Sequence, residues 1–526
     1  MFYFIPSWYN SQRSWYDRSE LWFRVFKRME FDDTVNQYKM FELSEEPACL
    51  LLLNYQPQLR YFLHKQGMAG AKYWSFFDDI QNVHRKETNP INFKRLSWPK
   101  DVRFLYNPFS VIAMVGSEIL AYIHFAEDGN LMLIDFQKNG HSDRSYYFDD
   151  RGFLSSICYF SDSGNAIYQD YLNENGVWQV REHLTNGFIV SQIEINPESD
   201  KEFEQTHYQS WEELLSEKLS EFNSTHVLED DKVVVAANEQ HNHLIMSIFK
   251  NQKKGFSFFK GRYLPNQNAA SRELLSVADL LIVDTQEQET ELKKSLTELG
   301  LENLSEKISR ISPFDTRLRL GHSQLVKELI VYFFIDTISK EELKERLIPI
   351  LTFMDTNPLL KLDMVTFNQD KDLSEIKLYI EQVIFDKLNP ANFFGEVEDS
   401  GENGLDDASE GLKNITIQVL SNESQVIATL DQARVVLDLG NSPDLYTQIA
   451  SISAGIPQIN SIPTSYVSHK KNGWILSDNS SKELLKALSF YLDSLSHWNE
   501  SLVYSVKKMS DYTSGHILSQ WKELLR

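Results

Sequence analysis

The stretch from Asp438 to Ile459 reads D-L-G-N-S-P-D-L-Y-T-Q-I-A-S-I-S-A-G-I-P-Q-I, and Lys470 to Leu476 reads K-K-N-G-W-I-L. The first stretch follows an apolar run, Val435–Leu437, that predicts a buried parallel strand. The two stretches together contain P-x-L-Y, then G-x-P-x-I, then N-G-x-I-L. This ordered frame decides the fold class that the rest of the chain must fit.

The frame resembles the nucleotide-sugar half of retaining GT-B glycosyltransferases. That resemblance implies two glutamates, separated by seven residues, that hold the donor's ribose and support the sugar at its reacting carbon. This chain has no glutamate between Glu423 and Glu483. Counting back from the glycine of the frame puts Ser442 and Ala450 at the two positions, and alignment on P-D-L-Y puts Thr447 at the first. We therefore predict that the fold is kept and the chemistry is lost.

The amino-terminal half points the same way. Active enzymes of this class turn from their first strand to their first helix through glycines, which let backbone amides approach a diphosphate. Here the first glycine is Gly67, and the predicted first strand, Phe2–Ile5, runs into P-S-W-Y-N at residues 6–10. The resemblance also implies an Arg and a Lys after the first strand of the second domain. Lys340 is present, but Ile335 falls where the Arg would be. We predict a pseudo-glycosyltransferase without catalytic residues, cofactor or metal.

Composition limits the class of protein further. A net charge of −23 over 526 residues argues against a nucleic-acid partner, because phosphates must be neutralised by Lys and Arg. Cys49 and Cys158 are the only cysteines, which excludes a disulfide framework and favours a reducing compartment. The amino terminus lacks the pattern of a secretory signal, and no apolar run reaches the length of a membrane span. The expected location is the cytoplasm.

Hydrophobic patterning divides the chain into an α/β protein with one β-rich insertion. A first Rossmann-like domain is predicted over 1–99 and 206–312, a second over 313–500, and a helix that crosses back to the first domain over 501–526. Further predicted elements are strands at Cys49–Leu53, Tyr73–Phe77, Lys232–Ala237, Asp279–Val283, Leu329–Ile335, Asp363–Phe367 and Ile415–Gln418, and helices at Glu20–Met29 and Ser481–Trp498. The acidic stretch Glu396–Glu410 is expected to be a solvated loop, with an acidic docking element as the alternative.

Residues 100–205 are predicted to form an inserted antiparallel meander. Turn dipeptides recur every 11 or 12 residues, at Asp128-Gly129, Asn139-Gly140, Arg151-Gly152, Ser163-Gly164, Asn175-Gly176 and Asn186-Gly187. Asn-Gly and Asp-Gly suit two-residue hairpin turns, in which both central residues have positive φ. The meander segments Y-Y-F-D-D-R-G-F (146–153) and G-V-W-Q-V-R-E (176–182) resemble the β-rich insert of bacterial glycosyltransferases that modify serine-rich adhesins.

The combination of frame, insert and missing acids is similar to the Asp family of accessory Sec proteins, in particular to the first of its three members. The resemblance implies four partners: the two sister Asp proteins, the accessory motor ATPase and the glycosylated serine-rich adhesin. It predicts a non-catalytic subunit that binds the glycosylated adhesin and supports its export. Two alternatives stay open. One is an active transferase acting on Ser/Thr-rich protein through Asp438 or Asp444, and the other is an assembly scaffold without a glycan ligand.

Two surfaces are candidate binding sites. Trp8, Tyr9, Trp15 and Tyr16, with Trp22 beyond them, crowd the region of a GT-B acceptor, where they would stack on sugars or pack in the core. The segment 250–262 reads K-N-Q-K-K-G-F-S-F-F-K-G-R and has no acid. We expect it either to contact an anionic lipid surface, which would make the protein peripheral at the inner face of the plasma membrane, or to be an incidental loop. The contact residues would be Lys253, Lys254, Phe258, Phe259, Lys260 and Arg262.

Other chemistry-bearing pairs are weak candidates. His241 and His243 have no further ligand at metal-binding spacing, so a surface or capping role is expected. Asp78-Asp79 is expected to be a solvated strand end. No Walker-type phosphate loop occurs in the chain.

Overall fold

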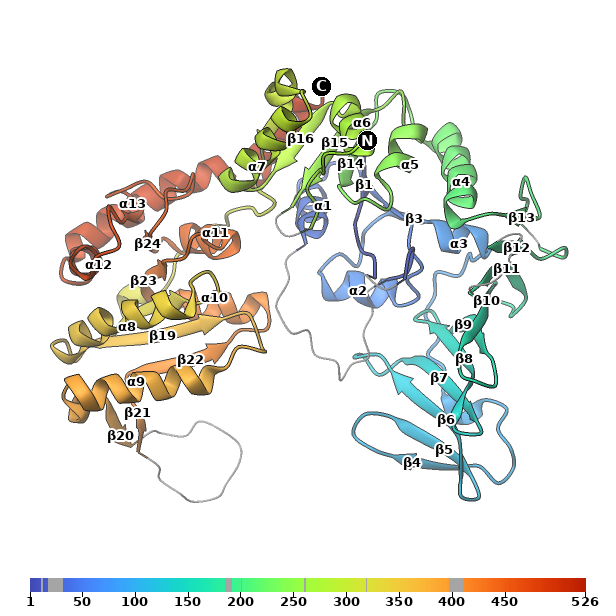
Figure 1. Ribbon diagram of the computed structural model, residues 1–526, viewed down its shortest axis with the longest axis horizontal. Coiled ribbons are helices and arrows are strands. Elements are labelled where there is room, and N and C mark those ends of the chain that lie inside the picture. The colour runs from blue at the N-terminus through green and yellow to red at the C-terminus, as the bar shows by residue number, and fades with distance from the viewer. Residues whose placement is uncertain are drawn as a thin grey trace.

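The computed structural model describes residues 1–10, 13–17, 32–184, 192–199, 201–259, 262–317, 319–396 and 410–526. Two parallel sheets covered by helices lie side by side, and a long antiparallel sheet extends from the first of them (Figure 1). The predicted helix Glu20–Met29, Trp22, the Asn186-Gly187 turn, Lys260 and the acidic residues 397–409 lie outside the described residues.

The first domain is built on a seven-stranded parallel sheet in the order β17-β16-β15-β14-β1-β2-β3. Its strands are β1 (Phe2–Ile5), β2 (Ala48–Leu52), β3 (Tyr73–Ser75), β14 (Lys232–Ala236), β15 (Lys253–Phe258), β16 (Leu280–Val283) and β17 (Ile308–Arg310). Its helices are α1 (Asp33–Leu43), α2 (Leu59–Lys65), α3 (Phe76–Ile80), α4 (Trp211–His226), α5 (Asn242–Ile248), α6 (Ala269–Val277) and α7 (Gln286–Glu298). Strands such as β1 are buried throughout, as expected when helices cover both faces of a parallel sheet.

The chain leaves this domain after α3 and returns at α4 through a ten-stranded antiparallel sheet, in which β4 to β13 follow one another in chain order. The strands are β4 (Arg103–Tyr106), β5 (Val111–Val115), β6 (Glu118–Phe125), β7 (Leu131–Lys138), β8 (His141–Asp149), β9 (Phe153–Phe160), β10 (Ala166–Leu172), β11 (Trp178–His183), β12 (Ile193–Ile195) and β13 (His207–Tyr208). We call this sheet the meander.

The turn geometry differs from the prediction. Among the predicted turns that the structure describes, only Asn139-Gly140 has positive φ at both residues, 53° and 81°. At Gly129, Gly164 and Gly176 the glycine alone is left-handed, and its N–H donates to the carbonyl three residues earlier. These are longer loops in which a type I turn is followed by one left-handed residue, a geometry that needs glycine at a single position.

The second domain has a six-stranded parallel sheet in the order β22-β19-β18-β23-β24-β25. Its strands are β18 (Leu329–Phe334), β19 (Leu360–Thr366), β22 (Ile415–Val419), β23 (Ala433–Asp438), β24 (Gln458–Asn460) and β25 (Gly473–Ile475), and a separate hairpin pairs β20 (Phe394–Glu396) with β21 (Glu410–Leu412). Helices α8 (Lys340–Asp355), α9 (Leu373–Lys387), α10 (Glu423–Gln432) and α11 (Leu445–Ala454) belong to this domain.

The carboxyl-terminal segment connects the two domains. The helix predicted over 481–498 is two helices, α12 (Ser481–Leu492) and α13 (Leu495–Met509), because Ser494 accepts a hydrogen bond from the His497 N–H and so starts a new helix. Helix α14 (Ser514–Leu524) then packs on α1 of the first domain, where fully buried Trp521 meets Phe41 edge to face. The last helix therefore lies in the core of the domain that holds the first strand.

A buried ionic cluster fixes the meander to the first domain. Arg151, from the turn between β8 and β9, donates to Asp149 at 2.8 Å and to Asp78 of α3 at 2.6 Å. Arg60 of α2 pairs with Asp149 at 2.8 Å and with Asp150 at 2.5 Å. Asp78, expected to be solvated, is thus an anchor for the meander.

Candidate functional site

The loop after β23 lies where the sequence frame places a donor site, and its carboxylates are bound to the protein itself. Asp438 is almost completely buried and accepts hydrogen bonds from the Thr337 hydroxyl at 2.5 Å and from the Asp444 N–H at 2.6 Å. Burial raises the pKa of Asp438 to about 7. The Asp444 side chain caps α11 by accepting from the Thr447 N–H at 2.8 Å. Both acids therefore support the loop.

The glycine of this loop is required by close packing. A Cβ on Gly440 would lie 2.0 Å from the Thr337 carbonyl oxygen, so the loop after β23 contacts the loop after β18 directly. Gly455, at the end of α11, has φ of 75° and leaves no room for a side chain beside Leu502 of α13. Gly440 thus serves close backbone packing, and Gly455 provides the left-handed conformation at the end of α11.

The three positions that replace the donor-site glutamates have other roles. Ser442 donates to the carboxylate of Glu287 at 2.5 Å, and Glu287 lies in the first turn of α7 in the first domain. Thr447 is fully buried in α11, and Ala450 packs partly buried against the core of the second domain. The Ser442–Glu287 bond joins the two domains across the predicted donor loop, and no sequence pattern indicates it.

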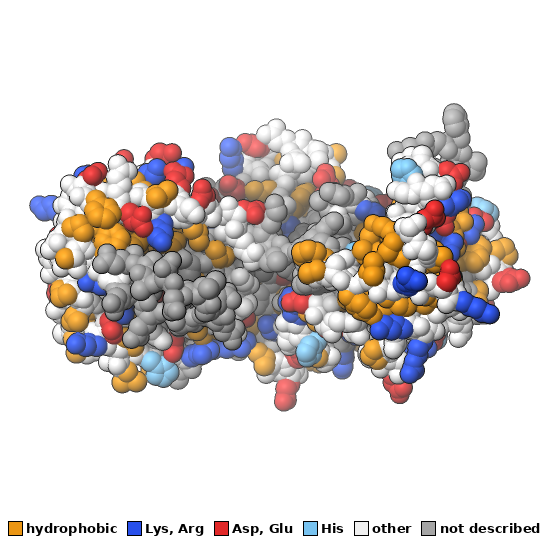
Figure 2. All heavy atoms as spheres, turned by 90° about the horizontal axis from the view of Figure 1, so that it is seen from below, with side chains coloured by type: hydrophobic (Ala, Val, Ile, Leu, Met, Phe, Trp, Pro, Cys, Tyr) orange, Lys and Arg blue, Asp and Glu red, His pale blue; other side chains and the backbone are white. Residues whose placement is uncertain are grey.

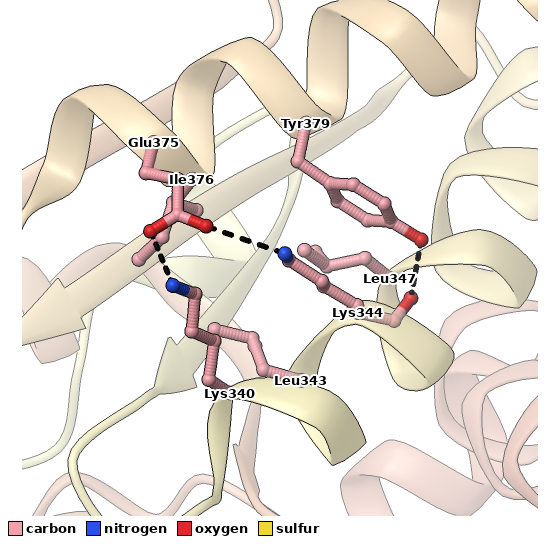
Figure 3. Close-up of a pocket in the computed structure, with 7 residues that line it drawn as sticks. All are labelled: Lys340, Leu343, Lys344, Leu347, Glu375, Ile376 and Tyr379. Carbon is pink, nitrogen blue, oxygen red and sulfur yellow. Dashed lines mark hydrogen bonds and ion pairs between the residues drawn. The ribbon is translucent and has the colours of Figure 1, made fainter.

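Lys340, the one residue present of the Arg and Lys expected after the first strand of the second domain, is paired with an acid of the protein itself. Lys340, at the start of α8, pairs with Glu375 of α9 at 2.5 Å, and Lys344 pairs with the other oxygen of the same carboxylate at 3.3 Å (Figure 3). The hollow between these helices has a cavity volume of about 10 Å³, room for no more than a water molecule. Ile335, at the position of the expected Arg, is fully buried.

The aromatic residues predicted to stack on sugars are mostly core residues. Trp8 is 6% exposed, Tyr9 is 6% exposed and Trp15 is 1% exposed. The Tyr9 hydroxyl bonds Nδ1 of His241 at 2.7 Å, while Nε2 of that ring lies 2.9 Å from the Ala236 carbonyl oxygen. Half-buried Tyr16 accepts a hydrogen bond from Gln169 of the meander at 2.7 Å. The structure contradicts a sugar platform at Trp8, Tyr9 and Trp15, because the loop after β1 turns inward.

The structure also contradicts the predicted lipid contact of the basic segment 250–262 at most of its described residues. The segment forms β15, an interior strand of the first sheet, so Lys254 and Phe258 are buried. Lys253 is exposed but pairs with Asp279 at 3.0 Å, and Arg262 pairs with the buried Asp33 at 2.5 Å. Phe259 packs against the core of the second domain. Lys253 and Arg262 are neutralised by acids distant in the sequence, whereas the buried Lys254 ammonium donates to the carbonyls of Phe249 and Gln252. The phenylalanines of β15 alternate with small residues, as an interior strand requires.

The described residues carry no sign of a metal centre or of a membrane span. No cluster of three or more His, Cys, Asp or Glu side chains could hold a metal ion among them. His243 lies 3.8 Å from Glu273 at the surface, apart from the buried His241. No helix of the described part is long and apolar enough to cross a membrane.

Two parallel-sheet domains joined by a crossing carboxyl-terminal helix define a protein of the GT-B class. The pneumococcal O-GlcNAc transferase GtfA, solved with UDP and GlcNAc, has the same fold at a TM-score of 0.67, with 13% identity over 100% of this chain and 98% of that chain. The family model described as the accessory Sec system protein Asp, member one, matches residues 1–526. This chain belongs to that family.

Two relatives cover the whole chain. The member-one Asp protein of the accessory Sec system of Streptococcus gordonii is 35% identical over 531 residues, which span 100% of this chain and 99% of the relative. A solved structure of accessory secretory proteins 1, 2 and 3 in Streptococcus pneumoniae contains a chain that matches at a TM-score of 0.80 and 32% identity, over 100% and 99% of the two chains. The GT-B-like fold and the family resemblance predicted from the sequence are both confirmed.

Proposed function

We propose that this chain is a non-catalytic GT-B-like subunit of an accessory Sec complex, in which it binds other proteins. The proposal is supported mainly by the loop after β23, whose polar side chains are bound to the protein itself. Asp438 and Asp444 hold the loop itself, and Ser442 bonds Glu287 across the two domains. An active transferase that uses Asp438 or Asp444 is disfavoured, because neither carboxylate is free to face a sugar.

The proposed partners are the two sister Asp proteins, the motor ATPase and the glycosylated adhesin. The sister proteins are supported by the pneumococcal relative, whose structure contains accessory secretory proteins 1, 2 and 3. The motor ATPase and the adhesin rest on family membership alone, and a cytoplasmic location rests on the content of only two cysteines. Burial of Trp8 and Trp15 removes the predicted glycan platform and so favours the assembly role over glycan binding at that cleft.

We expect no binding or hydrolysis of UDP-glucose or UDP-N-acetylglucosamine. Each missing transition-state contact is worth about 2–4 kcal/mol, and both glutamates are absent. Isothermal calorimetry at millimolar nucleotide sugar should show no heat of binding, and an assay for released UDP should match the blank. An active GT-B transferase of serine-rich adhesins is the positive control. Saturable micromolar binding with release of UDP would contradict the proposal.

The purified chain should co-elute with its two sister Asp proteins in gel filtration at micromolar concentration. The physical reason is the meander, whose strands near β4 leave large apolar side chains exposed. Light scattering of the shared peak would give its stoichiometry. Elution of all three proteins as separate monomers would show that this chain does not work in such a complex.

A further inference from the structure

The meander ends in an open edge. Strand β4 has one neighbour, β5, and no other described strand pairs with it. The Asn107 N–H donates to the Ser110 carbonyl at 3.1 Å, which fixes the alternation of the antiparallel pair. By that alternation the main-chain groups of Phe104 and Tyr106 point away from the sheet. They form a short template for another strand.

Apolar side chains surround this edge. Leu105 is 52% exposed, Tyr106 61%, Phe109 55% and Ile119 38%, and they lie on β4, β6 and the turn after β4. In the view from below, the meander end of the molecule shows an apolar patch with Lys and Arg side chains around it (Figure 2). Edge strands that are protected against pairing with another chain carry charged side chains and few apolar ones. This edge carries both kinds. The combination is typical of a surface that is covered in an assembly.

The charges around the patch are predominantly positive. Lys94, Arg95, Lys100 and Arg103 are all exposed, and none pairs with a carboxylate among the described residues. Asp101 is the one acid between residues 91 and 106. This local positive charge lies on a chain with a net charge of −23, so it selects a partner surface that is itself acidic.

We propose that β4 is a docking edge for an extended, acidic segment of a partner protein, which adds to the meander as a further strand. The inference rests on the proposed function, in that the partner is one of the sister Asp proteins. An anionic bilayer would also match the cations and the apolar side chains. It would leave the outward main-chain groups of Phe104 and Tyr106 without hydrogen-bond partners, whereas a strand satisfies them.

Site-specific photo-crosslinking tests the position of the contact. The full chain, with Tyr106 replaced by p-benzoylphenylalanine, is co-expressed with both sister proteins and irradiated. We expect a crosslink to one contiguous acidic segment of one sister, identified by mass spectrometry. The same replacement at Tyr504, an exposed residue of α13, is the control and should give no such product. An intact complex without a crosslink from position 106 would overturn the inference.

Affinity measurements test the chemistry. Tyr106→Pro removes an outward N–H at an edge where proline is tolerated, and the triple change Lys94→Glu, Arg95→Glu and Lys100→Glu reverses the charge. Each variant should bind the sister proteins at least about tenfold more weakly, with an unchanged melting temperature. Lys138→Glu, an exposed cation of the same sheet, is the matched control and should bind as the parent does.

The outcomes separate the two proposals. If the parent chain does not assemble with its sister proteins, the proposed function and the docking edge both fail. If it assembles and the edge variants assemble equally well, the docking edge alone fails. Flotation on phosphatidylglycerol vesicles is measured in parallel, and Tyr106→Pro should leave it unchanged. Lost flotation with normal protein assembly would identify a bilayer as the occupant and overturn the inference.

Discussion

Replacing Trp15 with alanine should lower the free energy of unfolding by about 3–5 kcal/mol, the range for a buried large aromatic residue. Trp15 is 1% exposed, its ring meets Tyr9 edge to face at 5.5 Å, and its Nε1 donates to Glu212 at 3.1 Å. Alanine removes the packing and leaves the Glu212 carboxylate without that donor. It also keeps a side chain at a residue whose φ is 59°, so no backbone strain is relieved.

Urea denaturation followed by circular dichroism measures this loss. Phe385→Ala, which removes an aromatic ring that is largely exposed on α9, should change the free energy of unfolding by less than about 1 kcal/mol. Binding of the sister proteins by the folded fraction of Trp15→Ala should be normal. A stable Trp15→Ala protein with impaired binding would instead identify Trp15 as a contact residue.

Arg151→Met should be similarly destabilising, by about 3–5 kcal/mol, because it removes one of the two cations that neutralise the carboxylates of Asp149 and Asp78. Arg151 and Asp149 are nearly inaccessible, and within the described part of the chain Asp149 would keep only Arg60 as a charged partner. Burial and the neighbouring Asp149 already raise the pKa of Asp150 to about 6. The change should therefore loosen the attachment of the meander to the first domain.

Thermal unfolding and limited proteolysis of the meander measure this effect. Arg144→Met is the matched control, because Arg144 lies in the same sheet but its ion pair with Asp143 is substantially exposed. The control should lose less than about 1 kcal/mol. Equal stability of the two variants would show that the buried cluster does not hold the meander in place.

The fold could be predicted from patterns that are local in the sequence. Regular glycine turns specify a meander whatever lies elsewhere, and apolar runs such as Leu329–Ile335 are typical of interior parallel strands. Strand β15 was missed because its first two residues are lysines and its apolar residues alternate with glycine and serine. Its lysines are tolerated because Asp279, distant in the sequence, pairs with Lys253.

The candidate site was less predictable, because burial depends on long-range packing. The absence of glutamates around Ser442 and Ala450 is visible in the sequence, whereas the Ser442–Glu287 contact joins residues 155 apart. The sequence of an aromatic pair that follows a first strand does not show whether its rings point into a cleft or into the core. The ring of Trp8 turns inward, where it packs on Phe62 of α2.

The placement of α14 has a consequence for synthesis of the chain. Ile517, Leu518 and Trp521 belong to the same apolar cluster as Phe2, Phe4 and Phe41. A nascent chain emerging from the ribosome therefore holds an exposed apolar surface on its earliest segment until residues near 521 are also outside the exit tunnel. Such a surface is prone to aggregation, so packing of the first domain is finished only once α14 has been synthesised.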